Sequence, residues 1–188
     1  LVMSATIDGA RVADLLGRGG GAAPVVVSEG RSFPIETRYL GRSPNRPLDE
    51  EVADAVVRAL RAETGSFLAF LPGQGEIRRV ERRLAERIDD PGVDVVALYG
   101  ALDARTQDRA IAPAPVGRRK VVLATAVAET SLTIEGVRVV VDSGLARVPR
   151  WEPSVGIGRL ETVRVSRATA DQRRGRAGRT EPGVCYRL

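Results

Sequence analysis

Histidine is absent from the 188 residues of this chain, which also holds a single cysteine, a single methionine and a single tryptophan. Without histidine, the chain has no Ser-His or Cys-His catalytic pair and no histidine-ligated metal site. The lone cysteine, Cys185, lies in the apolar run 184–186, which predicts a buried core residue. No apolar run approaches membrane-spanning length and no signal peptide is visible, so we expect a cytoplasmic protein.

Basic residues outnumber acidic ones by 29 to 24, and Lys120 is the only lysine. Such an arginine bias fits contacts with phosphate or nucleic acid, but a GC-rich coding sequence explains it equally well. Hydrophobic residues make up 43% of the chain, enough for a globular fold with a substantial core.

One stretch, residues 171–179, concentrates four arginines and two glycines behind a glutamine. If this stretch is helical, Gln172, Arg176 and Arg179 are spaced four and then three residues apart, which places them on one helix face. Guanidinium groups on one face, with glycines that allow close backbone approach, suit a polyphosphate or a transferring phosphoryl group. The alternative is an ordinary solvated basic helix end.

The segments before residue 48 are irregular. Residues 9–16 have helical periodicity, residues 25–27 resemble a short buried strand, and residues 29–47 are rich in glycine and proline. That last composition suits a linker running into an edge strand, since residues 35–40 alternate apolar and polar side chains.

Beyond residue 48, apolar strands alternate with amphipathic helices, which predicts an α/β fold with a mostly parallel sheet covered on both faces. The helices are expected at 49–62, 76–88 and 103–112, and the strands at 66–71, 93–98, 120–124, 137–141 and 183–188. Ligands of such sheets bind beyond the carboxyl ends of the strands. Pro72-Gly73, Tyr99-Gly100, Thr125 and the segment 142–144 all fall at those ends.

An antiparallel hairpin interrupts this alternation at about residues 146–165, with its turn expected at 153–158. Its arginines and its tryptophan could make it a nucleic-acid wedge, with Arg150 and Trp151 as contacts, or it could be an ordinary surface hairpin. The side chains in question are Arg147, Arg150, Trp151, Arg159 and Arg164.

Three segments together resemble motifs III, V and VI of superfamily 2 helicases, and more narrowly the DEAH/RHA family. They are Ser4-Ala5-Thr6, residues 124–134 (ATAVAETSLTI) and residues 172–179 (QRRGRAGR). The resemblance covers almost the whole chain, and three motifs in order are highly specific. Residues 115–120 and the hairpin sequence Trp151-Glu152-Pro153 look most like a bacterial member.

The resemblance implies a RecA-like (P-loop NTPase-type) fold and an ATP-dependent RNA helicase. Residues 1–28 would then be the C-terminal remnant of a first RecA-like domain, 29–47 a linker, and 48–188 the second RecA-like domain. It implies that Arg176 and Arg179 are catalytic arginine fingers on the ATP phosphates, where such groups give rate effects of about 10³–10⁵. Gln172 would lie near the γ-phosphate and the attacking water.

Other roles also follow from the resemblance. Nucleotide contacts fall on Ser131, Thr133 and Ile111, and nucleic-acid contacts on Thr125, Gly73 and Gly100. Ser4 and Thr6 would couple hydrolysis to strand movement. The partners implied are single-stranded nucleic acid, RNA foremost, and the protein's own first RecA-like domain.

Departures from the family pattern bear on how complete the site is. Ala126 replaces a frequent asparagine, and Ile111 stands where many relatives carry an aromatic ring that stacks on adenine. The phosphate loop and the Asp-Glu-x-His motif are missing, so ATP with Mg²⁺ would be held mainly by residues outside this chain, and we expect the isolated chain to be inactive. Two other readings are open: a nucleotide-independent nucleic-acid-binding module, and a metabolic enzyme for a phosphorylated small molecule.

Overall fold

The computed structural model describes residues 9–17, 21–26, 33–129, 132–152 and 156–188. The chain divides into two compact units, residues 1–31 and 32–188. In the first unit, the predicted helix is confirmed as α1 (Gly9–Leu16), which buries Ala13. The predicted buried strand is wrong at Val25 and Val26, which are 54% and 95% exposed and lie outside any strand, since no described residue of this unit pairs with them. Ser4, Thr6 and Val27 lie outside the described residues.

The second unit contains a six-stranded sheet in which every neighbouring pair of strands is parallel, as predicted. The strands, in spatial order, are β1 (Ile35–Tyr39), β8 (Gly183–Arg187), β5 (Val137–Asp142), β2 (Ser66–Phe70), β4 (Arg119–Ala124) and β3 (Val93–Leu98). The edge strand expected at the end of the linker is β1, which pairs with β8 from Ile35 to Tyr39. Residues 35–39 therefore belong to the sheet.

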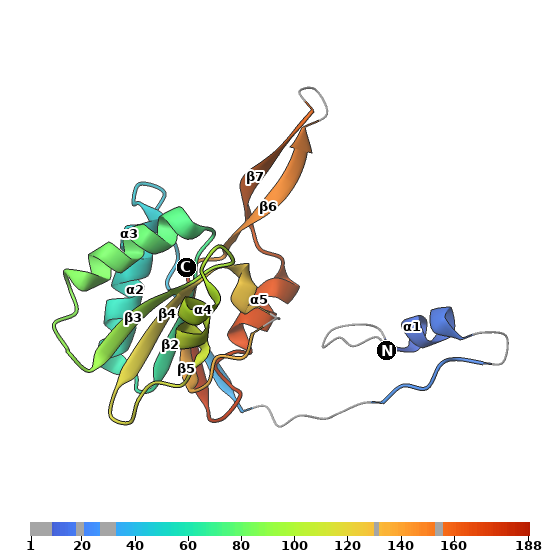
Figure 1. Cartoon of the computed structure of the whole chain (residues 1–188), viewed down its shortest axis with the longest axis horizontal. Coiled ribbons are helices and arrows are strands. Elements are labelled where there is room, and N and C mark those ends of the chain that lie inside the picture. Colours follow the sequence, from blue (N-terminus) through green and yellow to red (C-terminus); the bar gives the residue numbers. More distant parts are fainter. Residues whose placement is uncertain (1–8, 18–20, 27–32, 130–131, 153–155) are drawn as a thin grey trace. The chain divides into compact units, whose positions relative to one another are not determined.

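Helices cover both faces of this sheet (Figure 1). Helices α2 (Leu48–Ala62) and α3 (Gln74–Ala85) pack on one face, where Phe67 and Ala69 of β2 point. Helix α4 (Ala104–Ile111), the short 3₁₀ turn η1 (Ala126–Ala128) and the region after α5 (Arg167–Arg174) cover the other face, where Leu68 and Phe70 point. The alternation of β2 side chains between two apolar clusters explains why its sequence is apolar throughout.

The hairpin forms from β6 (Leu145–Glu152) and β7 (Ile157–Arg164), and it projects away from the sheet (Figure 1). The expected turn at 153–158 is too long, because pairing continues to Glu152 and Ile157. Residues 153–155 lie outside the described residues.

Helix α5 ends at Arg174, so the prediction that Gln172, Arg176 and Arg179 share one helix face is wrong. The backbone tightens instead: the Arg176 amide donates to the Arg173 carbonyl and the Ala177 amide to the Arg174 carbonyl. Of the two glycines there, Gly178 serves packing. A Cβ on Gly178 would lie 2.7 Å from the Phe33 carbonyl oxygen and from Cγ1 of Ile35, so this glycine allows close approach to the segment around β1.

Candidate functional site

The carboxyl ends of the strands form one continuous edge, as predicted. Backbone bonds continue the ladder one residue past the strands: the Leu71 amide donates to the Ala124 carbonyl (2.8 Å) and the Thr125 amide to the Leu98 carbonyl (3.2 Å). The chain leaves the sheet immediately afterwards. Three predicted nucleic-acid residues, Gly73, Gly100 and Thr125, therefore lie at this edge, after β2, β3 and β4.

The two glycines of this edge differ in their surroundings. Gly73 is buried at the N-cap of α3, and an ideal Cβ there would lie 2.5 Å from Nη1 of Arg147 and 3.0 Å from Oε2 of Glu76. The Arg147 guanidinium, at the root of the hairpin, thus covers the start of α3 and donates to Glu76. Gly100 is exposed, and a Cβ added there would meet no atom within 4 Å. Backbone approach from solvent is open at Gly100, whereas at Gly73 it requires Arg147 to move.

Thr125 is half-buried at the N-cap of η1, and its carbonyl accepts from the Ala128 amide. This turn begins the motif V segment, defined here as residues 124–134. Ile111 is half-buried at the last position of α4. Ser131 lies outside the described residues.

Arg176 is buried against the motif V segment. Its Nη1 donates to the Leu132 carbonyl (2.7 Å) and its Nη2 to the Glu129 carbonyl. Burial, together with the neighbouring positive charge of Arg179, lowers the pKa of Arg176 to about 10, opposed by the attraction of Glu129. The guanidinium is still charged at neutral pH, and it meets backbone carbonyl dipoles where a carboxylate would be the stronger partner.

Arg179 also reaches the motif V segment, since its Nη1 donates to Oγ1 of Thr133 at 3.1 Å. Both residues are exposed. The fold therefore brings together three of the predicted nucleotide-side residues, Arg176, Arg179 and Thr133. Gln172 is half-buried on α5, one position before Arg173.

Sequence reasoning missed Arg173, a fully buried arginine with four partners. Its Nε and Nη2 donate to Oε1 of Glu129 (2.8 and 2.6 Å), and its Nη1 donates to Oδ1 of Asp142 (2.8 Å) and to the Leu145 carbonyl (3.1 Å). Its guanidinium carbon lies 4.9 Å from the centre of the Phe70 ring. Asp142, also fully buried, was the available signal, because a carboxylate that directly follows an apolar strand needs a buried cationic partner.

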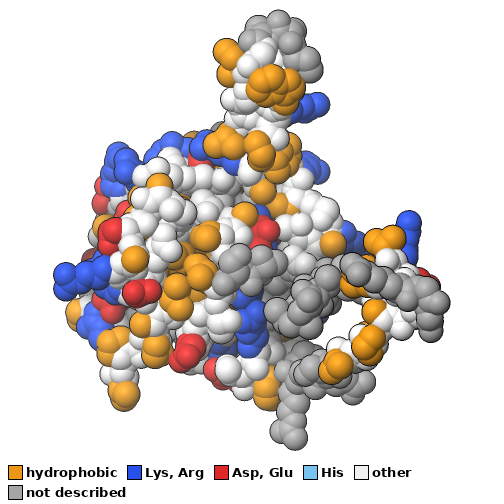
Figure 2. Space-filling model, turned by 45° about the vertical axis from the view of Figure 1, so that its right-hand side comes forward, with side chains coloured by type: hydrophobic (Ala, Val, Ile, Leu, Met, Phe, Trp, Pro, Cys, Tyr) orange, Lys and Arg blue, Asp and Glu red, His pale blue; other side chains and the backbone are white. Residues whose placement is uncertain are grey.

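The hairpin presents two different faces. Adjacent strand residues point to opposite sides, so Arg150 and Trp151, which we predicted together as nucleic-acid contacts, lie back to back. Arg150 pairs with Glu161 (2.7 Å) on the charged face. Trp151 is 64% exposed on the other face, called the apolar face here, which it shares with Leu160 and, nearer the root, with Arg147. Figure 2 shows hydrophobic side chains gathered on this projecting element.

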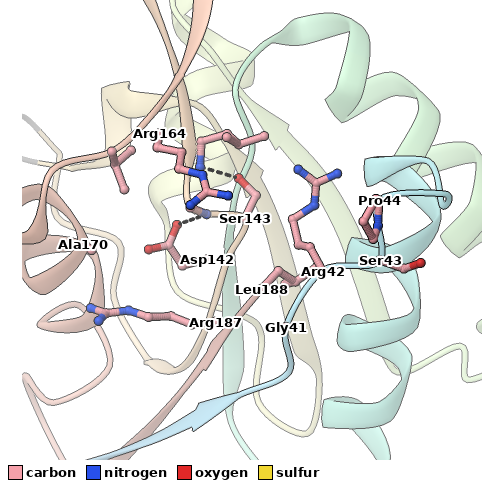
Figure 3. A pocket seen from close by; sticks show the side chains of 13 residues that line it. Gly41, Arg42, Ser43, Pro44, Asp142, Ser143, Arg164, Ala170, Arg187 and Leu188 are labelled. Carbon is pink, nitrogen blue, oxygen red and sulfur yellow. Dashed lines mark hydrogen bonds between the residues drawn. The ribbon is translucent and has the colours of Figure 1, made fainter.

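A cavity of about 590 Å³ lies at the carboxyl edge beside the root of the hairpin (Figure 3). Its wall comes from the loop after β1, the ends of β5 and β8, and the hairpin root. Arg42 and Arg164 point into it, and Arg42 is paired with Glu51 at 3.0 Å. The lining includes the predicted strand-end residues 142–144 but none of Gln172, Arg176 or Arg179. Gln172, Arg176 and Arg179 therefore lie outside this cavity.

Within the described ranges, none of the helices is both long and apolar enough to cross a membrane.

Three comparisons bear on this geometry. The profile of the helicase conserved C-terminal domain matches residues 50–181. The chain is 55% identical over 190 residues to the ATP-dependent RNA helicase HrpB of Escherichia coli (strain K12), covering all of this chain and 23% of that protein. It is 39% identical over 193 residues to the pre-mRNA-splicing factor ATP-dependent RNA helicase prp22 of Schizosaccharomyces pombe, covering 16% of that protein.

A solved structure supports the same family. The crystal structure of the Escherichia coli DEAH/RHA helicase HrpB superposes with a TM-score of 0.90 at 54% identity, covering 99% of this chain and 23% of that one. The chain thus spans less than a quarter of the length of these HrpB relatives. The RecA-like fold and the resemblance to DEAH/RHA helicases, and to HrpB among bacterial members, are confirmed. This chain belongs to the helicase conserved C-terminal domain family.

Proposed function

We propose that this chain is the second motor half of an ATP-dependent RNA helicase, and that Arg176 and Arg179 act there as arginine fingers. The observation that supports this most is the convergence of both guanidinium groups on the motif V segment, at Glu129, Leu132 and Thr133. Relatives that match the chain along its whole length are named ATP-dependent RNA helicases. We propose helicase activity for a longer protein that contains this chain, because the chain spans less than a quarter of the length of these relatives.

Hydrolysis would use these groups electrostatically. Negative charge spreads over the oxygens of a transferring γ-phosphoryl group, and two guanidinium groups placed against it lower the barrier without any covalent step. Gln172 would orient the attacking water. Mg²⁺ would supply further charge neutralisation when bound, and its ligands, like most phosphate ligands, would come from residues outside this chain.

The present partners of Arg176 suggest how nucleotide is sensed. Both of its described bonds go to neutral backbone carbonyls, and a phosphate oxygen is a stronger, charge-assisted acceptor. Binding ATP would exchange the carbonyls for phosphate and free the motif V segment, in which Ser131 and Thr133 are the proposed sensors and Thr125 the proposed contact to the nucleic-acid backbone. Ile111 would pack on the base.

The nucleic-acid path would follow the carboxyl edge, past Gly73, Thr125 and Gly100. Backbone groups and a hydroxyl there suit phosphate and sugar contacts, which read little sequence. Residues 1–28 would be the end of the first RecA-like domain, with Ser4 and Thr6 coupling the two domains. Residues 29–47 would be the linker, within which residues 35–39 form β1 of the sheet. The protein would work in the cytoplasm.

Replacing Arg176 or Arg179 in the full-length protein tests the arginine-finger proposal. We expect Arg176→Ala and Arg179→Ala to lower RNA-stimulated ATP turnover about 10³-fold with folding preserved. The matched control is Arg118→Ala, which removes an exposed ion pair with Asp94 at the amino-terminal side of β3 and β4. Wild-type turnover in both finger variants would contradict the proposal. Unchanged turnover with weakened RNA binding would favour the nucleotide-independent module.

The hairpin gives a second test, because its faces are separable. If the apolar face stacks on bases, Trp151→Ala lowers affinity for single-stranded RNA by about tenfold, the range of one base–aromatic stack. Arg150→Ala, on the opposite face, is the matched control and removes only an exposed pair with Glu161. Deleting residues 148–162 without any change in RNA affinity or unwinding would remove the hairpin from the strand path.

A further inference from the structure

The Arg173 side chain joins four segments of the second unit that meet beside the candidate site. It starts from α5, pairs with Glu129 of the motif V segment and with Asp142 at the end of β5, and bonds the Leu145 carbonyl at the first residue of the hairpin. Its guanidinium lies over Phe70 at the end of β2. We infer that Arg173 is a positioning residue that couples the nucleotide-side arginines to the hairpin.

The geometry of a guanidinium makes this coupling possible. One planar group donates in fixed directions, so the acceptors on Glu129, Asp142 and Leu145 are held at a set separation from one another. A lysine ammonium is a point charge with rotatable donors and cannot fix the three together. Because Arg173 and Asp142 are both fully buried, water cannot replace either partner.

The nucleotide side is electrostatically linked to this set. Arg173 pairs with the carboxylates of Glu129 and Asp142, and the charge of Glu129 also attracts the Arg176 guanidinium. Glu129 connects the two arginines, since its carboxylate accepts from Arg173 and its carbonyl accepts from Arg176. A departure of Arg176 toward phosphate removes one positive charge from this set and alters the field at Glu129 and Asp142.

The hairpin is linked covalently to this set, because β6 begins three residues after Asp142. Asp142 is followed directly by Ser143, Gly144 and the start of β6, and its Oδ1 accepts from the Gly144 amide at 2.9 Å. The same oxygen accepts from Arg173. Any displacement of Arg173 is therefore transmitted to the backbone on which the hairpin is hinged. This coupling rests on the proposed arginine-finger function, but its consequence differs from a loss of hydrolysis.

The test compares two adjacent arginines of α5 in the full-length protein, Arg173→Lys and its matched control Arg174→Lys. Arg174 bonds Oγ1 of Thr37 (3.0 Å) on β1 and does not contact the set just described. For Arg173→Lys we expect the number of RNA duplexes separated per ATP hydrolysed to fall about tenfold, a size typical of an interrupted coupling, with KM for ATP unchanged. Arg174→Lys should leave this ratio at the wild-type value. The ratio is independent of the fraction of folded protein.

A second variant covers the case in which Arg173→Lys does not fold. Glu129→Gln keeps an acceptor of the same shape and removes the charge, and we expect the same selective loss of duplexes separated per ATP. Equal losses of hydrolysis and unwinding, with the ratio unchanged in both variants, would overturn the coupling role. Failure of the arginine fingers is seen separately, as wild-type ATP turnover in Arg176→Ala.

Hydrogen exchange of the full-length protein tests the same link without ATP. Arg173→Lys should raise amide exchange both in residues 125–129 and in residues 144–148, while Arg174→Lys should leave both segments unchanged. Faster exchange in only one of the two segments would show that Arg173 supports that segment alone, and would overturn the inference.

Discussion

The two faces of the sheet bury charge in different ways. On the side covered by α2 and α3, the buried carboxylate of Asp49 in the first turn of α2 is paired with Arg79 and Arg83 of α3, whose side chains are 49% and 38% exposed. On the face under α4, η1 and α5, the buried carboxylate of Asp142 is paired with Arg173, which is itself fully buried. The arginines paired with Asp49 reach solvent, whereas the arginine paired with Asp142 does not.

The two kinds of ion pair differ in what they contribute to the protein. An ion pair that reaches solvent contributes little and tolerates change, whereas a buried pair costs desolvation of both ions and is kept only with well-placed hydrogen bonds. The second face bears that cost where the motif V segment, the arginine stretch and the hairpin root meet. We conclude that the apolar first face mainly holds the sheet together, and that the second face is built to fix groups in place.

The largest effect expected from this comparison is on unfolding free energy. Arg173→Met leaves Asp142 and Glu129 without their cation and should lower the free energy of unfolding of the chain by about 3–5 kcal/mol. Arg83→Met, the matched change on the first face, should cost far less, because Asp49 retains Arg79 and access to water. Urea unfolding of both variants measures this. Equal losses would mean that the two faces do not differ as argued.

The sequence predicted most of the fold, because apolar strands and amphipathic helices leave strong periodic signals. Strand β3 falls at the predicted 93–98, and α2 differs from the prediction by one residue. The failures lie where tertiary contacts decide. Helix α5 ends at Arg174 with Gly175 as its C-cap, and the chain then brings Gly178 close to Phe33 and Ile35.

The candidate site was predictable in its residue types but not in its contacts. Arg176, Arg179 and Thr133 were expected near each other from the motifs, and the structure brings them together. Nothing in the spacing of residues 171–179 separates the buried Arg173 from its exposed neighbour Arg179. That distinction depends on Asp142 and Glu129, which are distant in sequence and meet Arg173 only in the folded chain.

A smaller effect is expected at the two phenylalanines of β2. Both are fully buried, Phe67 facing the first apolar cluster and Phe70 the second, beneath the Arg173 guanidinium. Phe67→Leu and Phe70→Leu remove similar volume, but Phe70→Leu also removes the cation–π contact. Its loss of unfolding free energy should therefore exceed that of Phe67→Leu by about 1 kcal/mol. A larger loss of unfolding free energy in Phe67→Leu would contradict this prediction.

The smallest effect concerns Cys185, whose side chain belongs to the second cluster. Burial, reinforced by the negative charge of Asp142, raises the pKa of this thiol from 9.0 to about 12. Between these values the unfolded chain loses the thiol proton while the folded chain keeps it. The stability contributed by the buried thiol is therefore complete below pH 9 and declines as the pH rises toward 12. Urea unfolding at pH 8, 9 and 10 measures that decline.

Two variants on β8 separate the faces in this experiment. Cys185→Val removes the ionisable group and should flatten the decline above pH 9, whereas Tyr186→Phe should keep it, because Tyr186 belongs to the first cluster and burial raises the pKa of its phenol above 10.0. Native Cys185 should also resist thiol alkylation at pH 8 and react once the chain is unfolded, since the thiolate is the reactive form. Rapid alkylation of the native chain would show that the second face opens beside Asp142, and the buried charge set would then lose the exclusion of water on which its geometry depends.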